Sequence, residues 1–295
     1  MRQTDRQQLP DAMPDMYNLK LSDKMFSLFS DFIYKKLGIH LPQAKKIMLQ
    51  YRLIKRLKKL KMKSFEDYFS YLTSVDGLKK ELPRMINVVT TNKTDFFREP
   101  YHFQYLSENV LPEFCKQKHS RPFKIWSSAC SIGAEPYTMA MVLQEFAEKN
   151  RQFRYNILST DISTKALKTA QNAIYDHEMV DIIPIELRKK YLLKKKDQNQ
   201  SALVRIAPEL RQKVKFKQMN LMLSTYPVDT QMDVIFCRNV IIYFDRKTQE
   251  RVVKTLSCHL KPGGYLFMGH SESIKFDGLP IERVKSTIYR KKADT

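Results

Sequence analysis

The chain has 295 residues, enough for one large domain or two smaller ones around a substantial core. Its composition is 43% hydrophobic and 28% charged, which excludes wholesale disorder. The net charge of +21 predicts attraction to an acidic partner, and nucleic acid, an anionic membrane surface and an acidic protein all meet that description.

The cysteines and histidines show no spacing typical of metal ligands, so we expect reduced thiols and no metal. No run approaches the roughly 18 apolar residues of a membrane span. Residues 1–16 have the polar composition of a disordered tail without a signal-like apolar segment. Together these features predict a cytoplasmic protein.

Residues 17–91 follow a helical period and predict an all-α N-terminal domain with four helices. We expect the first helix to end at Gly38, the second to begin at Pro42, the third to be capped by Ser64 and the fourth to span 79–89. The apolar face of the second helix is predicted from residues spaced by three or four: Ile47, Tyr51, Ile54, Leu57 and Leu60.

The same second helix carries a run of basic residues with no acidic residue among them. Its members are Lys45, Lys46, Arg52, Lys55, Arg56, Lys58, Lys59, Lys61 and Lys63. Such a run is either an ordinary solvated helix face or a docking surface for an acidic partner. Solvated faces usually mix both signs of charge, which favours the docking surface.

Residues 92–295 alternate between strand and helix patterns, which predicts a mostly parallel α/β sheet. The expected strands are 123–127, 155–160, 214–218, 233–237 and 265–268, followed by a hairpin of 281–285 and 287–291. The expected helices are 101–115, 135–148, 163–173 and 246–260. The hairpin would make one strand antiparallel, and residues 178–211 break the pattern as an insertion.

Polar residues follow four of these strands and predict a ligand site at the carboxyl edge of the sheet. They are the segment 128–135, Asp161, Asn220 and the pair Arg238-Asn239. Asp161 is expected to accept hydrogen bonds from ribose hydroxyls, although an N-cap role for the next helix is the alternative. The turn 128–135 contains only one glycine, Gly133, which favours a phosphate-free adenosine cofactor such as S-adenosylmethionine over a dinucleotide.

Long motifs occur in order along the chain. They are Thr-Asn-Lys-Thr-Asp-Phe-Phe-Arg-Glu at 91–99, Trp-Ser-Ser-Ala-Cys-Ser-Ile-Gly-Ala-Glu-Pro-Tyr at 126–137, Phe-Cys-Arg-Asn-Val-Ile-Ile-Tyr-Phe-Asp at 236–245, Leu-Lys-Pro-Gly-Gly-Tyr-Leu-Phe at 260–267 and Gly-His-Ser-Glu-Ser at 269–273. With them the chain, from about residue 20 to 290, resembles the chemotaxis receptor methyltransferases of the CheR type.

The resemblance implies an S-adenosylmethionine-dependent protein-glutamate O-methyltransferase. It implies a helical N-terminal domain, a Rossmann-like class I methyltransferase domain and a small inserted β-subdomain at about 178–211. Members methylate glutamate side chains on the cytoplasmic helices of chemoreceptors, with S-adenosylhomocysteine as the product. We therefore expect those receptors as partners and a monomeric enzyme that binds no nucleic acid.

Matched by position, the resemblance also implies the site residues. The cofactor contacts would be Asn92, Thr94, Arg98, Glu135, Asp161, Asn220, Leu221, Arg238 and Asn239. Arg98 and Tyr243 would lie beside the reacting methyl group as the catalytic residues. We further hypothesise that four residues of the basic helix contribute to receptor recognition: Arg52, Lys55, Arg56 and Lys59.

The sequence departs from the family at Ala134 and Lys93, where glutamate is common. Segment 194–200 lacks the paired glycines with which family members bind a receptor C-terminal pentapeptide, so binding of that peptide stays open. Two other functions compete with the main reading: a nucleic-acid methyltransferase and a non-catalytic module that binds the cofactor or the receptor. Arg238-Asn239-Val240-Ile241 lacks the prolines typical of nucleic-acid amino methylases, which counts against the first.

Overall fold

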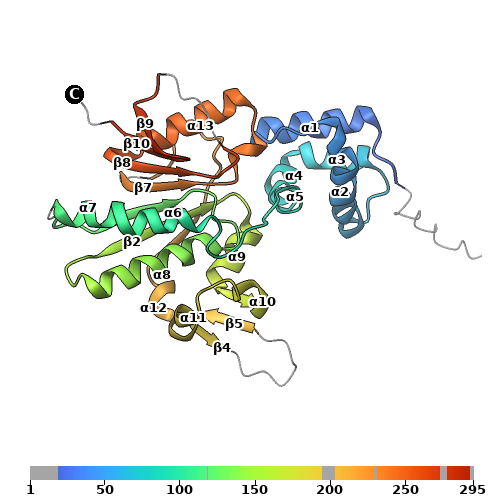
Figure 1. Cartoon of the computed structure of the whole chain (residues 1–295). Helices are drawn as coiled ribbons and strands as arrows, with labels where there is room; N and C mark the ends of the chain where they lie inside the picture. The colour runs from blue at the N-terminus through green and yellow to red at the C-terminus, as the bar shows by residue number, and fades with distance from the viewer. Residues whose placement is uncertain (1–18, 118, 195–202, 229–230, 273–277, 293–295) are drawn as a thin grey trace, which may run out of the picture. The chain divides into compact units, whose positions relative to one another are not determined.

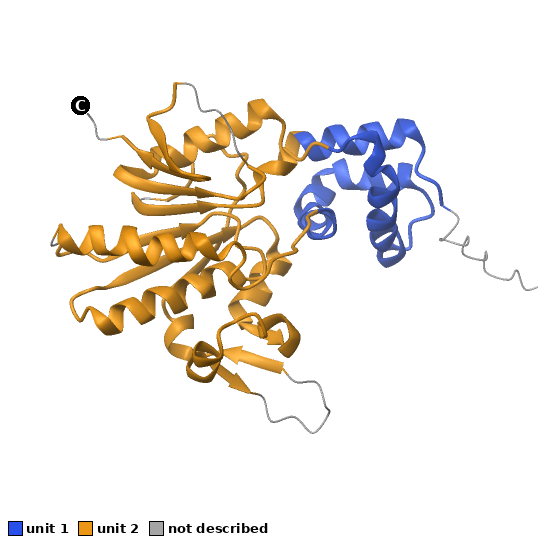
Figure 2. Ribbon diagram, in the orientation of Figure 1, with its two compact units in different colours: residues 1–34, 41–89 blue, residues 35–40, 90–295 orange. Residues whose placement is uncertain are grey.

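The computed structural model describes residues 19–117, 119–194, 203–228, 231–272 and 278–292 (Figure 1). They form two compact units, Met1–Tyr34 with Leu41–Val89 and Lys35–His40 with Thr90–Thr295 (Figure 2). The expected tail, 1–16, lies outside the described residues. The sequence predicted one continuous helical domain over 17–91, whereas Lys35–His40 belongs to the second unit.

The first unit is built from helices. They are α1 (Asp23–Leu37), η1 (Gln43–Lys45), α2 (Lys46–Leu60), α3 (Phe65–Thr73), α4 (Val75–Lys80) and α5 (Leu82–Val89). Ser64 caps α3 as predicted, because its Oγ accepts the N–H of Asp67 at 3.0 Å. The predicted fourth helix is instead the pair α4 and α5. They are separated at Glu81, whose side chain is fully buried.

The buried face of α2 differs from the prediction. Leu49, Leu53 and Leu57 are fully buried, whereas Ile47 is 66% exposed and Tyr51 is 60% exposed. Both sets repeat at four-residue steps, so spacing alone could not decide between them. The prediction for Ile47 and Tyr51 was therefore wrong.

The second unit contains a seven-stranded sheet in the order β6-β2-β1-β7-β8-β10-β9. The strands are β1 (Phe123–Ser127), β2 (Tyr155–Asp161), β6 (Val214–Gln218), β7 (Met232–Cys237), β8 (Leu260–Met268), β9 (Ile281–Lys285) and β10 (Ile288–Lys291). β10 pairs antiparallel with both β8 and β9, and the pairs among β6, β2, β1, β7 and β8 are parallel. The predicted sheet with one antiparallel strand is confirmed.

Alternate strand residues face two hydrophobic clusters. Ile125, Val234 and Phe236 join the cluster that contains the buried residues of α8. Trp126 and Ile235, one position along, join the cluster that contains residues of α13. A strand covered on both faces needs a continuous apolar run, which explains why β7 is buried along its whole length.

The helices of this unit agree broadly with the prediction. They are α6 (Pro100–Tyr105), the π-helical turn η2 (Leu106–Val110), α7 (Leu111–Lys116), α8 (Ala134–Lys149), α9 (Thr164–Asn172), α10 (His177–Val180), α11 (Ile185–Tyr191), α12 (Pro208–Arg211), η3 (Ile241–Tyr243) and α13 (Arg246–Cys258). The single helix predicted for 101–115 contains the π turn just before Pro112. Proline has no N–H to donate, and such a residue commonly disturbs the helical hydrogen-bond register.

The inserted β-subdomain is a separate sheet in the order β3-β5-β4. Its strands are β3 (Ile174–Asp176), β4 (Leu192–Lys194) and β5 (Leu203–Ile206), all paired antiparallel. The sheet therefore begins at Ile174, before the predicted start at 178. The segment 195–202, which includes most of the stretch compared with the pentapeptide-binding region, lies outside the described residues.

Candidate active site

The candidate site lies at the carboxyl ends of the central strands, where α8 begins. The turn between β1 and α8 requires glycine at Gly133, which adopts φ +97°. A Cβ there would lie 2.8 Å from the Cβ of Ala170 and 2.9 Å from the hydroxyl of Tyr175. The turn is therefore packed against α9 and β3, and it directs Glu135 in the first turn of α8 toward the strand ends.

At the centre of the site, Arg238 lies between two carboxylates. Its Nη1 donates to Oε2 of Glu135 at 3.0 Å, and its Nη2 lies 3.2 Å from Oε2 of Glu99. Ser127 Oγ donates to the other oxygen of Glu135 at 2.7 Å. Arg238 and Glu135 were both predicted as cofactor residues, and the structure brings them into direct contact.

The two carboxylates of this cluster differ in their pKa shifts. Burial raises the pKa of Glu135 and outweighs the opposing effects of Arg238 and Ser127. Burial also acts on Glu99, but there Arg238 and hydrogen bonds from Asn239 and His270 prevail and lower its pKa. With all three side chains ionised, Glu99, Glu135 and Arg238 carry a net charge of −1.

Asp161 ends β2 and is 9% exposed. Its Oδ2 accepts the N–H of Ser131 at 2.7 Å, and its Oδ1 accepts the N–H of Ser163 at 2.8 Å. The N-cap of α9 is Ser163, whose Oγ accepts the N–H of Ala166. The N–H of Ile162 also bonds to this carboxylate, and the lone-pair capacity that remains is available to a ribose hydroxyl.

The loop before α6 contributes Asn92, Thr94 and Arg98. The carbonyl of Asn92 accepts a hydrogen bond from the hydroxyl of Ser131 at 2.9 Å. Thr94, two residues later, is half-buried. The carbonyl of Arg98 accepts a hydrogen bond from Arg238, while its own guanidinium donates to the carbonyl of Lys93 at 3.4 Å. Arg98 is thus joined to the central cluster through its backbone.

Asn220, Leu221 and Tyr243 are connected through the segment Lys35–His40. Asn220 Nδ2 donates to the carbonyl of Lys36 at 2.9 Å, and the carbonyl of Tyr243 accepts the N–H of His40 at 2.8 Å. Leu221 is buried in the cluster that contains α13, and Tyr243 packs on the same cluster from η3. The contacts just described for Asn220, Leu221 and Tyr243 do not include Glu99, Glu135 or Arg238.

The four residues predicted to recognise the receptor do not share one environment. Lys55 and Lys59 are exposed on α2, and Arg52 is half-buried with its guanidinium on the carbonyl of Val89. Arg56 is only 7% exposed and donates to both oxygens of Glu81 at 2.7 and 2.8 Å. Arg56 therefore does not belong to the predicted surface, because a buried partner 25 residues along the chain holds its side chain inside the unit.

Sequence reasoning missed Glu99, Ser127 and Glu272 as site residues, and it included Ser131 only as part of the segment 128–135. Glu99 and Glu272 lie inside the motifs 91–99 and 269–273, so the motif match could have indicated them. Ser131 adopts φ +50° and Glu99 φ +56°, left-handed conformations that are uncommon for non-glycine residues. Nothing in the sequence indicated this backbone strain.

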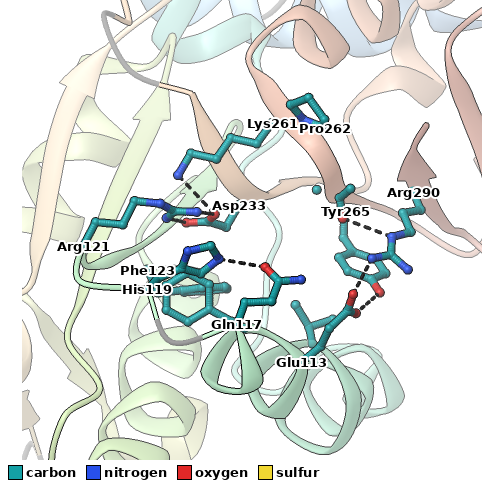
Figure 3. A pocket seen from close by; sticks show the side chains of 14 residues that line it. Glu113, Gln117, His119, Arg121, Phe123, Asp233, Lys261, Pro262, Tyr265 and Arg290 are labelled. Carbon is teal, nitrogen blue, oxygen red and sulfur yellow. Dashed lines mark hydrogen bonds and ion pairs between the residues drawn. The ribbon is translucent and has the colours of Figure 1, made fainter. Parts of the chain in front are cut away.

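A cavity of about 130 Å³ lies elsewhere, lined by the first residues of β1, β7 and β8 (Figure 3). On one wall Asp233 accepts from Arg121 at 2.7 and 2.8 Å, and from Lys261 at 3.1 Å. On the other, Glu113 accepts from Tyr265 at 2.6 Å and from Arg290. The acidic and basic side chains of each wall are therefore paired with one another. The cavity lies at the opposite edge of the sheet from the candidate site.

The residues of the candidate site fit S-adenosylmethionine. The cofactor carries a sulfonium and an ammonium, which match the net negative charge of the Glu99, Glu135 and Arg238 cluster. Among the described residues, Arg238 Nε is buried without a hydrogen-bond partner, and the Oε2 of Glu99 has the ion pair with Arg238 but no hydrogen bond of good geometry. Asp161 offers the acceptor for the ribose. These side chains would hold the cofactor, Asp161 by accepting hydrogen bonds from its ribose and Glu135 by the attraction of its negative charge to the cationic groups.

Among the residues that the structure describes, no helix combines the length and apolar character that crossing a membrane requires. No group of three or more His, Cys, Asp or Glu side chains in this part of the chain is arranged to hold a metal ion.

The sheet order, the turn before α8 and the acidic strand ends define a class I methyltransferase that uses S-adenosylmethionine. The sequence profile described as "CheR methyltransferase, SAM binding domain" matches residues 92–290, and "CheR methyltransferase, all-alpha domain" matches residues 24–90. The chain therefore belongs to the CheR methyltransferase family.

Named relatives agree with this assignment. A chemotaxis protein methyltransferase of Borreliella burgdorferi is 36% identical over 278 residues, covering 93% of this chain and 96% of the relative. The protein of the same name from Klebsiella aerogenes is 40% identical over 258 residues, covering 86% and 85%. The one from Escherichia coli is 36% identical over 255 residues, covering 86% of each chain.

Proposed function

We propose that this protein transfers the methyl group of S-adenosylmethionine to glutamate side chains on the cytoplasmic helices of chemotaxis receptors, forming glutamate methyl esters and S-adenosylhomocysteine. It acts as a monomer in the cytoplasm and reaches the membrane only through its receptors. The observation that carries this proposal is the Glu99, Glu135 and Arg238 cluster, together with Asp161 at the end of β2, because these side chains supply acceptors for a cationic, ribose-bearing cofactor.

The acceptor chemistry explains why the site needs no general base. A glutamate carboxylate has an ordinary pKa near 4.3, so it is already the nucleophile at neutral pH. When bound, the cofactor supplies an electrophilic methyl group on a sulfonium. The tasks left to the chain are alignment of the carboxylate with that methyl and exclusion of water from the pair.

Arg98 and Tyr243 are assigned to that alignment. Arg98 is half-buried, and its weak 3.4 Å contact with the carbonyl of Lys93 leaves most of its donors available for a carboxylate. We assign this guanidinium to the glutamate of the substrate. Tyr243 packs from η3 on the cluster containing α13, and its ring is assigned to one wall around the methyl group.

The exposed side of α2 is assigned to the receptor. Lys55 and Lys59 supply the charge that attracts an acidic helix, with Arg52 at the border of this surface. Ile47 and Tyr51 add exposed apolar area about two turns and one turn before Lys55, respectively. An amphipathic acidic helix fits this combination of charged and apolar side chains.

Incubation with S-adenosylmethionine labelled in the methyl group and with receptor-containing membranes tests the proposal. A base-labile, volatile label on receptor protein supports a glutamate methyl ester. An alkali-stable label on protein, or a label on RNA in a parallel reaction, would contradict it. A variant with Arg98→Met should lose methyl transfer to a far greater extent than it loses S-adenosylhomocysteine binding, since alignment of the acceptor is removed.

A further inference from the structure

The loop after β7 and the loop after β8 are joined by one buried carboxylate, that of Glu272. Its Oε1 accepts the N–H groups of Val240 at 2.8 Å and Ile241 at 2.9 Å. Its Oε2 accepts those of Asn239 at 2.8 Å and Gly269 at 2.7 Å. Three of these four donors are more than 30 residues away in the chain, so the contact is tertiary rather than a local turn.

The two loops approach each other so closely that a side chain is excluded at Gly269. A Cβ at this position would lie 2.6 Å from Nδ2 of Asn239 and 2.7 Å from Oε2 of Glu272. Asn239 itself adopts φ +57°, in the left-handed region that asparagine adopts more readily than most non-glycine residues. Its backbone N–H is held in this turn by Oε2 of Glu272.

The chemistry of this carboxylate is that of an internal anion. Glu272 is 2% exposed, and every donor that the described residues give it is a backbone N–H. Burial raises its pKa, while the four N–H groups oppose that shift. Charge-assisted hydrogen bonds from backbone groups are among the stronger and more directional ones, so they fix the loop in place.

We propose that Glu272 is a positioning residue for methyl transfer, fixing the Asn239–Ile241 backbone against Gly269 so that Asn239 faces the cofactor and Tyr243 follows in η3. The inference rests on the proposed roles of Asn239 and Tyr243. Glu272 acts through this loop and touches neither the cofactor nor the acceptor glutamate.

The first test is Glu272→Gln in the full chain, with Glu113→Gln as the matched control. Glutamine has an NH₂ group in place of one carboxylate oxygen. The two backbone N–H groups that bonded to that oxygen therefore lose their acceptor. Glu113 is also a paired carboxylate, but it lies at the opposite edge of the sheet. Amide hydrogen exchange at Asn239, Val240, Ile241 and Gly269 reports on the loop, and calorimetry with S-adenosylhomocysteine reports on the site.

We expect faster exchange at these amides and a loss of kcat/KM on the order of 10- to 100-fold in E272Q, with weaker binding of S-adenosylhomocysteine. E113Q should change neither. A purely structural role would instead lower the melting temperature of E272Q and leave Kd, KM and kcat of the folded protein unchanged, which overturns the inference. Should E272Q fail to fold, Glu272→Asp carries the same test, since its shorter side chain cannot reach both loops.

The outcomes separate this inference from the proposed function. If the wild-type chain binds S-adenosylhomocysteine and methylates receptors while both Glu272 variants match it, the positioning role fails and the function stands. If the wild-type chain does neither, the function fails and the inference fails with it.

Discussion

At the scale of single residues, the site contains two carboxylates, Glu99 and Glu135, that share one guanidinium, that of Arg238. Arg238 is the cation shared by Glu99 and Glu135, and it is 6% exposed. Burying two carboxylates around one guanidinium is unfavourable unless a further cation completes the set. Burial is the main cause of the raised pKa of Glu135, and the negative charge of Glu99 adds to it; a bound sulfonium would favour the ionised carboxylate.

Cofactor affinity should therefore depend on pH through Glu135. A cationic ligand prefers the ionised carboxylate, so affinity is full above the raised pKa of Glu135 and is lost as the pH falls through it. Calorimetric titration with S-adenosylmethionine from about pH 8 down to about pH 5 measures this. In Glu135→Gln we expect affinity about tenfold weaker at neutral pH and a flatter pH profile, for one lost charge-assisted contact. An unchanged profile in that variant would exclude Glu135 as the titrating group.

At the scale of elements, α2 has a buried side that packs inside the helical unit and an exposed side that is proposed to face the receptor. Its buried side contains Leu49, Leu53 and Arg56, and its exposed side contains Tyr51 and Lys55. The sequence predicted the helix and its charge, because both are local properties. It could not predict the burial of Arg56, because the partner Glu81 lies at the junction of α4 and α5 and the packing of those helices brings the two together.

The buried pair makes a prediction about stability. Arg56→Met leaves Glu81 buried without its cation, so we expect a loss of about 3 kcal/mol in the free energy of unfolding of the helical unit. Chemical denaturation followed by circular dichroism measures it. Replacing Glu81 by Met in the same chain should recover part of the loss, because no unpaired charge then stays buried. A single variant as stable as wild type would show that the pair contributes little.

For the exposed lysines of α2 we expect the opposite: substitution should change receptor binding and leave stability nearly unchanged. Lys55→Glu with Lys59→Glu should leave the melting temperature within the range of ordinary surface substitutions and raise KM for receptor several-fold at low salt. The difference from wild type should shrink as ionic strength rises, because exposed charges are screened. Methylation rates measured across a salt series test this. Equal KM values at low salt would remove α2 from the docking surface.

At the scale of the whole molecule, the sequence predicted the features that depend on local patterns better than the features that depend on long-range contacts. The runs 123–127 and 214–218 became β1 and β6 because continuous apolar or alternating segments have few other structures available. The convergence of Glu135, Asp161 and Arg238 followed from the parallel topology, since strand ends share one edge. The place of Lys35–His40 did not follow, because nothing in those six residues records their pairing with Phe244 and Tyr243.

That segment has a consequence for the isolated catalytic unit. A fragment of residues 90–295 contains every residue predicted to bind the cofactor, yet it lacks the carbonyl that Asn220 binds and the N–H that binds Tyr243. We expect it to bind S-adenosylhomocysteine about tenfold more weakly than the full chain, for the loss of hydrogen bonds worth about 1 kcal/mol each. Its melting temperature should also fall.

A substitution in the full chain separates this effect from that of truncation. Gly38 adopts φ +71°, and a Cβ there would lie 2.2 Å from the sulfur of Met222. Gly38→Ala should therefore displace the segment and weaken cofactor binding in the same direction, with the helical unit still attached. Calorimetry on the fragment, the variant and the full chain compares the three. If all three bind S-adenosylhomocysteine equally, the contacts of Lys36 and His40 do not position Asn220 and Tyr243, and the cofactor site is complete within residues 90–295.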